Sequence, residues 1–203
     1  MYLLCDIDGV LIPFPGKDGS IRPSHYRDQV TPTGHNKPVT IWLNPAHGPL
    51  LDDLITDTGI DPVWCTSWRA DAAALIGPRL GLPPWPHVDL PRLPLTDSHP
   101  NGYLWKRDHA TAHINGEPCA WIDDDFTPAD HDWASTRTAT GRPTLLIQPN
   151  PHDGLLAAHV DVIRQWASSV GQRRRPIGRS GCHRATGSAG SQRRVTWSRC
   201  RVE

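Results

Sequence analysis

Apolar and polar positions along the first 170 residues follow a pattern that predicts strands and helices in turn. Short apolar or β-branched runs are typical of buried strands, and they occur at residues 2–5, 39–43, 63–66, 120–122 and 144–147. Segments of helical periodicity separate or follow them, at residues 48–58, 70–80, 103–114, 129–138 and 155–168. Such alternation predicts βαβ units and therefore an α/β fold, a Rossmann-like parallel sheet with helices on both faces.

Two segments interrupt this alternation. Residues 13–38 are rich in Pro and Gly, contain the turn signal Lys17-Asp18-Gly19-Ser20 and have little helical periodicity. They predict a hairpin or short flap that projects beyond the first strand. Residues 82–101 are similarly rich in Pro and predict an extended connector.

Charge divides the chain into two parts, although the net charge is zero. Residues 1–170 contain 12 Lys and Arg against 20 Asp and Glu, whereas residues 171–203 contain nine Arg and one Glu. The second part is rich in Gly, Ser and Arg and lacks apolar periodicity, so we expect a domain over 1–170 and a disordered basic tail over 171–203. The tail is either a basic arm that contacts nucleic acid or an incidental extension.

The same composition argues against a membrane protein and a secreted one. No apolar stretch approaches the roughly 18 residues of a membrane span, and the N-terminus lacks the features of a secretory signal. The five cysteines form no CxxC pair, and three of them lie in strand-like runs. Small buried thiols of this kind predict a reducing, cytoplasmic location.

Functional groups follow the predicted strands where a parallel sheet would gather them. Ligands bind beyond the carboxyl ends of the strands in such sheets. Three of these ends carry polar residues, namely Asp6-Ile7-Asp8-Gly9, Thr66-Ser67 and Asp123-Asp124-Asp125. Lys106 opens a helical segment 17 residues before Asp123 and adds a cation.

The run of three aspartates predicts a metal site. Like charges at close range repel, and a cation relieves the repulsion. Carboxylate oxygens without neighbouring thiolate or imidazole ligands favour Mg²⁺ over zinc. The alternative is an acidic helix N-terminus, where Asp is also common.

These segments, taken in order, resemble the four motifs of the haloacid dehalogenase (HAD) superfamily. The motifs are DxDG after the first strand, a strand followed by Thr, an isolated Lys, and a strand followed by two Asp. The resemblance covers residues 1 to about 168 and implies the HAD fold. The details VWCTSW, AWIDDD and GRPTLLIQPNPHDGL also resemble the HAD domain associated with Swiss-army-knife RNA-repair proteins.

The resemblance implies a Mg²⁺-dependent phosphatase that hydrolyses a phosphate monoester through an aspartyl-phosphate. Asp6 would be the nucleophile and Asp8 the general acid and base. Lys106 would neutralise developing charge and hold Asp6, with Arg107 as the weaker alternative. The metal would be held by Asp6, the backbone carbonyl of Asp8, and Asp123 and Asp124, with the order within the last pair left open.

Other motif residues are expected to contact substrate or to shape the loop. Thr66 would bind a phosphoryl oxygen, with Ser67 as the alternative, and Gly9 would allow the turn after the nucleophile. Trp68 would stack a base or pack the strand ends, and Arg69 and His47 would each contact substrate or be solvated. Asp125 is expected to cap the following helix.

Only 40 residues separate Thr66 from Lys106, which leaves no room for a cap domain beyond a helix and a connector. With this minimal cap the open site can admit a large substrate, such as a polynucleotide end or a phosphoprotein, and we expect a nucleotide or a nucleic-acid end. Small metabolites and phosphoproteins are alternative substrates. A non-catalytic HAD-like module that binds nucleic acid is the alternative function.

Overall fold

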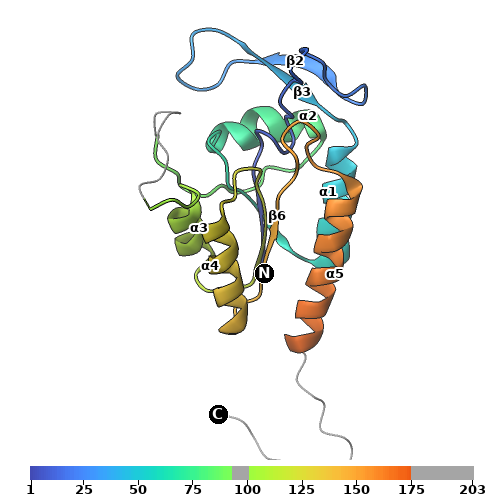
Figure 1. Cartoon of the computed structure of the whole chain (residues 1–203). Helices are drawn as coiled ribbons and strands as arrows, with labels where there is room; N and C mark the ends of the chain where they lie inside the picture. Colours follow the sequence, from blue (N-terminus) through green and yellow to red (C-terminus); the bar gives the residue numbers. More distant parts are fainter. Residues whose placement is uncertain (93–100, 175–203) are drawn as a thin grey trace, which may run out of the picture.

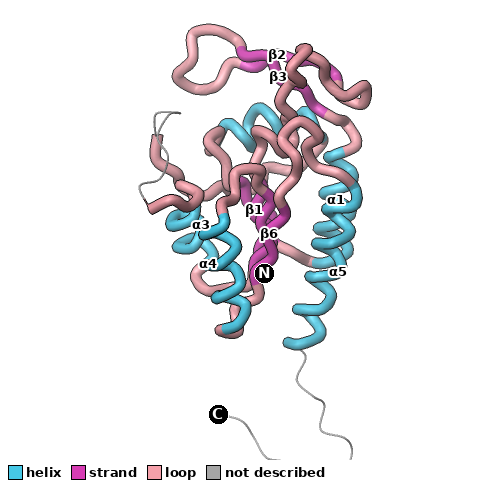
Figure 2. Tube along the Cα trace, in the orientation of Figure 1, coloured by secondary structure: helices cyan, strands magenta, loops and turns pink. Residues whose placement is uncertain are grey.

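A parallel sheet of four strands forms the centre of the protein (Figures 1 and 2). The computed structural model describes residues 1–92 and 101–174. The strand order is β4 (Asp61–Trp64), β1 (Tyr2–Cys5), β5 (Cys119–Ile122) and β6 (Thr144–Ile147). Each of these strands was predicted within two residues at its ends. β1 lies between β4 and β5, so the loops that follow these three strands are neighbours.

Helices cover both faces of the sheet, as predicted. In Figure 1, α3 (Arg107–Ile114) and α4 (Pro128–Ala139) lie on one side of the sheet, and α1 (His47–Thr58) and α5 (Ala157–Arg174) lie on the other. Alternate residues of a strand point to opposite faces, which divides the apolar residues of β1 between two cores. Leu3 joins the core under α1 and α5, and Leu4 joins the core under α3 and α4.

The flap is larger than the sequence indicates, and one strand was assigned to the wrong sheet. Residues Val39–Leu43 were expected in the parallel sheet, but they form β3, which pairs antiparallel with β2 (Tyr26–Val30). The apolar run of β3 arises because Ile41 and Leu43 are buried on one face of the hairpin. An apolar run predicts a strand but not its partner, so the pattern could not distinguish the two sheets.

Polar contacts hold the flap against the body of the protein. Arg22 pairs with Asp153, and the Nε of Arg79 donates to Asp28 Oδ2 at 2.6 Å. At the far end of the hairpin loop, the backbone N–H and the hydroxyl of Thr33 both donate to the carboxylate of Asp71, at 2.7 and 2.8 Å. Figure 1 shows the hairpin above the sheet, over the loops that carry the predicted motifs.

Two helical segments differ from prediction. Residues 70–80 were expected to form one helix, but a π-helical turn, η1 (Ala72–Ile76), precedes the short α2 (Gly77–Leu80). The long C-terminal helix α5 continues to Arg174, six residues past the predicted helix end at 168. The rest of the predicted basic tail, residues 175–203, lies outside the described residues.

Two broader expectations can also be compared with the structure. The three cysteines of the strand-like runs, Cys5, Cys65 and Cys119, are buried free thiols as predicted. No helix in residues 1–92 and 101–174 combines the length and apolar character needed to cross a membrane.

Candidate active site

The predicted motif segments meet at the carboxyl edge of the sheet. Backbone hydrogen bonds continue the parallel pairing one residue beyond the strands: Asp6 N–H donates to the Ile122 carbonyl at 3.0 Å, and Cys65 N–H donates to the Cys5 carbonyl at 2.9 Å. Asp123 N–H donates in the same way to the Ile147 carbonyl at 3.1 Å. This continued pairing fixes the backbone positions of Asp6 and Asp123, from which their side chains extend into the site.

Lys106 lies between two of these carboxylates. Its Nζ donates to Asp6 Oδ2 at 2.5 Å and to Asp123 Oδ2 at 2.8 Å, and the residue is only 3% exposed. Burial alone would lower the pKa of Lys106, but the charges of Asp123 and Asp6 outweigh burial and raise that pKa well above its ordinary value. Lys106 is therefore a fixed positive charge at the centre of the site.

Arg107, the alternative to Lys106, lies elsewhere. Its Nη1 donates to the Ala129 carbonyl at 3.0 Å and to Asp130 Oδ1 at 3.3 Å, and its guanidinium lies 3.3 Å from the ring centroid of Tyr103. These contacts join α3 to the start of α4. Of the two basic neighbours, Lys106 is the one that reaches Asp6.

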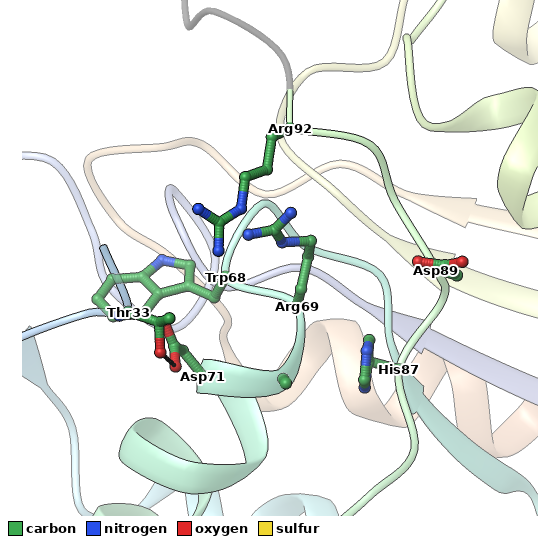
Figure 3. Close-up of a pocket in the computed structure, with 8 residues that line it drawn as sticks. Thr33, Trp68, Arg69, Asp71, His87, Asp89 and Arg92 are labelled. Carbon is green, nitrogen blue, oxygen red and sulfur yellow. Dashed lines mark hydrogen bonds between the residues drawn. The ribbon is translucent and has the colours of Figure 1, made fainter. Parts of the chain in front are cut away.

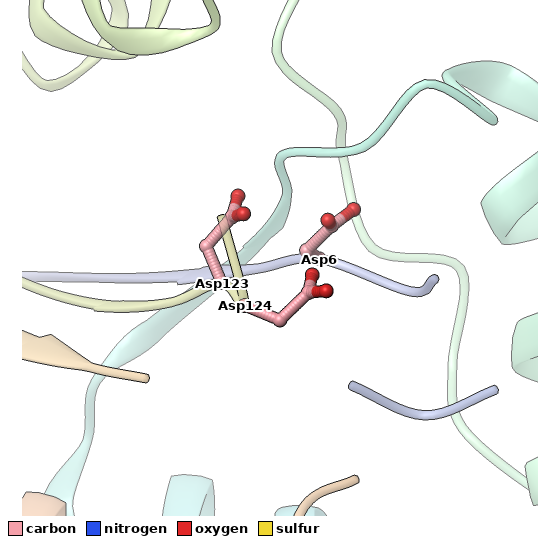
Figure 4. A group of neighbouring side chains, drawn as sticks. All are labelled: Asp6, Asp123 and Asp124. Atoms are coloured by element: carbon pink, nitrogen blue, oxygen red, sulfur yellow. The ribbon is translucent and has the colours of Figure 1, made fainter. Parts of the chain in front are cut away.

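Three carboxylates converge next to Lys106. One oxygen from each of Asp6, Asp123 and Asp124 lies within 4.8 Å of the others (Figure 4). The Oδ1 of Asp6 is buried without a hydrogen-bond partner in the described structure. A buried carboxylate oxygen without a partner costs free energy unless something binds it. This donor set, all hard oxygen, fits a divalent cation such as Mg²⁺.

Asp123 and Asp124 differ in how many of their oxygens are already engaged. Asp123 Oδ2 accepts from Lys106, and its Oδ1 accepts from the backbone N–H of Asp125 at 3.2 Å. Among the described residues, no side chain donates a hydrogen bond to the carboxylate of Asp124, whose only hydrogen bond comes from the backbone of the same residue. Burial, followed by the charges of Asp125 and Asp6, raises the pKa of Asp124 to about 6. The carboxylate of Asp124 is thus the more available of the two for a cation.

Gly9 has a steric reason to be glycine as well as a conformational one. Its φ is 69°, in the left-handed region that favours glycine, as expected for the turn after Asp6. A Cβ at this position would lie 2.2 Å from Asp124 Oδ2. The missing side chain therefore leaves the space that the Asp124 carboxylate occupies.

Asp8 lies beside the cluster, and its side chain is not one of the three converging carboxylates. Its Oδ2 accepts a hydrogen bond from Trp68 Nε1 at 3.0 Å and one from Ser67 Oγ at 3.4 Å. Burial and the nearby charge of Asp6 raise the pKa of Asp8 to about 6. A carboxyl with this pKa can give up and accept a proton near neutral pH.

Thr66 and Ser67 occupy different environments. Thr66 is 1% exposed, and its Oγ1 accepts a hydrogen bond from Trp68 N–H at 3.4 Å. Ser67 is exposed and its hydroxyl is directed to Asp8. The backbone N–H of Arg69 donates to the Thr66 carbonyl at 3.1 Å, so residues 66–69 form a turn at the end of β4.

Trp68 and Arg69 line an open pocket next to the cluster of Asp6, Asp123 and Asp124 (Figure 3). Thr33 of the flap and Arg92 of the connector also line the pocket. Neither of these two was singled out from the sequence, because their proximity to residues 68–69 arises only from folding.

Loop contacts that sequence reasoning missed hold the site in place. Gln148 Nε2 donates to the Asp124 and Phe126 carbonyls at 2.9 and 3.1 Å, and Leu155 N–H donates to the Val10 carbonyl at 2.7 Å. Gln148 directly follows β6, so the search for polar residues at strand ends could have found it. Leu155 offers no comparable signal.

Two further expectations need correction. Asp125 does not cap α4, because Thr127 begins that helix and its backbone N–H donates to Asp130 Oδ2 at 2.9 Å. His47, which the sequence left open as a substrate contact, is 1% exposed. Its Nε2–H donates to the Leu155 carbonyl at 3.0 Å, so it supports the loop next to Val10.

Comparisons with known proteins give only distant matches. No family model matches the chain, and no curated protein matches it. One matching structure, from Legionella pneumophila, carries the description of a HAD superfamily (subfamily III A) hydrolase; it is 15% identical, with a TM-score of 0.42 over 83% of this chain and 84% of its own. Another, from Vibrio cholerae, carries that of a 3-deoxy-D-manno-octulosonate 8-phosphate phosphatase, with 14% identity, a TM-score of 0.39, and 82% and 84% coverage.

At this level of similarity neither structure assigns a family, a substrate or a residue role to the chain. Neither links the chain to RNA-repair proteins.

Proposed function

We propose that this protein is a Mg²⁺-dependent phosphatase of the HAD type that hydrolyses a phosphate monoester through an aspartyl-phosphate. One observation carries the proposal: Asp6 is held at one oxygen by Lys106 while its other oxygen is buried without a partner beside Asp123 and Asp124. A purely structural ion pair has no need of two further carboxylates or of an unsatisfied oxygen.

In the first step the Asp6 carboxylate attacks phosphorus in line with the leaving oxygen. A bond forms between Asp6 and phosphorus, and the bond to the leaving oxygen breaks. Asp8 gives its proton to that oxygen, which departs as an alcohol. Lys106 offsets part of the negative charge, and the Thr66 hydroxyl donates to a phosphoryl oxygen.

In the second step water hydrolyses the aspartyl-phosphate. Asp8, now a carboxylate, takes a proton from water as the water oxygen attacks phosphorus. The bond between phosphorus and Asp6 breaks, so inorganic phosphate leaves and Asp6 is regenerated. The raised pKa of Asp8 suits it to both roles.

Asp6, Asp124 and the backbone carbonyl of Asp8 would hold Mg²⁺, which neutralises phosphoryl charge when bound. Asp123 would contribute negative charge next to the cation without binding it directly, because hydrogen bonds from Lys106 and Asp125 already engage both of its oxygens. The steric fit of Asp124 against Gly9 supports this assignment.

For the substrate we propose a nucleotide or a nucleic-acid end. Support comes from the half-buried indole of Trp68, which bonds Asp8 and also lines the open pocket with Arg69. Base–aromatic stacking contributes about 1–3 kcal/mol per base. A role of the basic tail in nucleic-acid binding stays a prediction, because residues 175–203 lie outside the described part of the chain.

Phosphate release from an aryl phosphate, measured with and without Mg²⁺, tests the proposal. We expect activity that EDTA removes and Mg²⁺ restores, and no activity in Asp6→Asn. The control Asp125→Asn makes the same chemical change at an exposed neighbour and should keep activity within a few-fold. Activity in Asp6→Asn equal to that of the wild type would overturn the mechanism.

A further inference from the structure

The open pocket next to Asp8 has a composition that the proposed reaction does not yet explain. It encloses about 280 Å³ between the flap, the turn after β4 and the connector that follows α2. The pocket is lined by one indole ring and by polar or charged side chains. They belong to Thr33, Trp68, Arg69, Asp71, His87, Asp89 and Arg92 (Figure 3).

Two arginines from separate segments share one side of this pocket. In Figure 3 the guanidinium groups of Arg69 and Arg92 point toward each other above the indole of Trp68. Within residues 1–92 and 101–174, neither guanidinium has an ion pair or a hydrogen bond. Two like charges held together without a counter-charge repel, and an anion between them removes the repulsion.

The acidic residues of the pocket do not fill that role. Both oxygens of Asp71 accept hydrogen bonds from Thr33, which holds the flap in place. Asp89 lies across the pocket beside His87 in Figure 3, away from the two guanidinium groups. No acidic side chain in residues 1–92 and 101–174 therefore pairs with Arg69 or Arg92, and both guanidinium groups are available to an external anion.

The backbone of Arg69 supports a functional role for its side chain. Its φ is 50°, a left-handed conformation that is rare and unfavourable for a long side chain. Glycine would adopt this conformation without that cost. An arginine here needs a reason other than the stability of the turn.

Trp68 places the pocket relative to the reaction. Its Nε1 donates to Asp8 Oδ2 at 3.0 Å, while its ring lines the pocket. Under the proposed function, Asp8 protonates the leaving oxygen. The pocket therefore lies on the side of the leaving group and not on the side of the transferred phosphoryl group.

We propose that Arg69 and Arg92 bind a second phosphate carried by the leaving group of the substrate. The proposal rests on the proposed phosphatase function. It narrows the substrate to an ester whose alcohol bears another phosphate or a phosphodiester, such as a nucleoside bisphosphate or the phosphorylated end of an oligonucleotide. Trp68 then packs against the part of the leaving group between the two phosphates.

Matched substrates test the proposal. We would measure kcat/KM for adenosine 3′,5′-bisphosphate, for adenosine 5′-monophosphate and for adenosine 3′-monophosphate, with p-nitrophenyl phosphate as a substrate without a second anion. The wild type should prefer the bisphosphate over both monophosphates. Arg69→Gln and Arg92→Gln should each reduce that preference about ten-fold, the size of one lost charge-assisted hydrogen bond, so that kcat/KM for the bisphosphate falls relative to kcat/KM for p-nitrophenyl phosphate.

Arg142→Gln is the matched control. Arg142 is exposed on the loop between α4 and β6, and its side chain makes no hydrogen bond to a described residue. The variant removes the same charge and should keep the wild-type preference. A 5′-phosphorylated dinucleotide identifies the source of the second phosphate, because a greater preference for it than for the bisphosphate would assign the pocket to a phosphodiester. A wild type without preference, or arginine variants that keep it, would overturn the proposal.

Binding to the Asp6→Asn variant separates this proposal from the proposed function. Calorimetric titration with adenosine 3′,5′-bisphosphate in the presence of Mg²⁺ needs no turnover. The added Arg69→Gln or Arg92→Gln change should weaken binding about ten-fold. If the protein shows no phosphatase activity but this weakening is observed, the anion site stands and the reaction fails. If activity is present and binding is unchanged, the reaction stands and the anion site fails.

Discussion

The carboxylate cluster and the open pocket are neighbours, yet they are built in opposite ways. In the cluster, Asp6 and Asp123 are buried, and continued sheet pairing together with hydrogen bonds from Lys106 positions their side chains. The pocket is open, and it is assembled from the flap, a turn and a connector that meet only in the folded protein. Changes in the cluster should therefore affect catalysis or folding strongly. Changes in the pocket should alter substrate choice.

After the loss of the nucleophile in Asp6→Asn, the largest expected effect on catalysis is in Asp8→Asn. General acid catalysis contributes about 10²–10⁴-fold, and alcohols that leave poorly need it most. We therefore expect a loss in this range with an alkyl phosphate and a much smaller loss with p-nitrophenyl phosphate. Ser67→Ala removes a weak hydrogen bond to the same oxygen and serves as the control. Equal losses with both substrates would remove Asp8 from the role of acid.

Lys106→Met should have the largest effect on stability. The change leaves Asp6 and Asp123 buried without their cation, and breaking a buried pair in this way costs about 3–5 kcal/mol. Urea unfolding in EDTA measures the loss. Lys17→Met, an exposed site on the flap, should change stability by less than about 0.5 kcal/mol. A loss no larger in Lys106→Met than in this control would mean that the cluster does not depend on the ion pair.

The lowered pKa of the buried His47 should make the stability of the protein depend on pH. Burial lowers its pKa from 6.5 to about 4 in the folded protein, and the nearby ring of His25 faces it at a centroid distance of 5.9 Å. Between these two pH values the unfolded chain binds a proton that the folded protein does not. The contribution of His47 to the free energy of unfolding should therefore be constant above about pH 6.5 and fall as pH drops toward 4, by at most about 3 kcal/mol.

The His47→Gln variant isolates this contribution. It removes the titrating group and keeps an N–H that can donate to the Leu155 carbonyl. The difference in unfolding free energy between wild type and variant should shrink from pH 7 to pH 4.5 in urea titrations. A difference that stays constant over this range would contradict the assignment.

The smallest expected effect on stability is in the pocket. Arg69→Gly relieves a left-handed arginine, so the variant should match the wild type or gain up to about 1 kcal/mol, although it loses the proposed selectivity. Asn115, the other described non-glycine residue with positive φ, caps α3. Asn115→Gly is the control, with an expected change of a few tenths of a kcal/mol because Asn tolerates this conformation. Marked destabilisation of Arg69→Gly would mean that Arg69 is there for structure.

The same comparison explains what the sequence could predict. Apolar runs that end in Asp6, Thr66 and Asp123 were visible because parallel strands bring their carboxyl ends to one edge. Val39–Leu43 has an equally clear strand pattern, but its pairing with β2 depends on the flap and was assigned wrongly. Arg92 had no local signal, because only folding brings it beside Arg69.

The ends of the helices were predicted less accurately, because several nearby residues can each begin a helix. Asp125 is a reasonable helix cap from its residue type, but Thr127 and Asp130 cap α4 together two residues later. The helix expected from 103 begins at Arg107, and Leu104 N–H donates instead to the buried carboxylate of Asp130. A tertiary contact of this kind is not encoded in the periodicity of the segment.

Trapping the phosphorylated enzyme tests the central claim most directly. The wild type would be mixed with a ³²P-labelled monoester and Mg²⁺ and quenched in acid during turnover. The quenched protein would then be reduced with borohydride, which converts an aspartyl-phosphate to homoserine. We predict homoserine at position 6 in the tryptic peptide of residues 1–17. Label on another residue would contradict the role of Asp6, as would turnover that transfers phosphorus to water without any label on the protein.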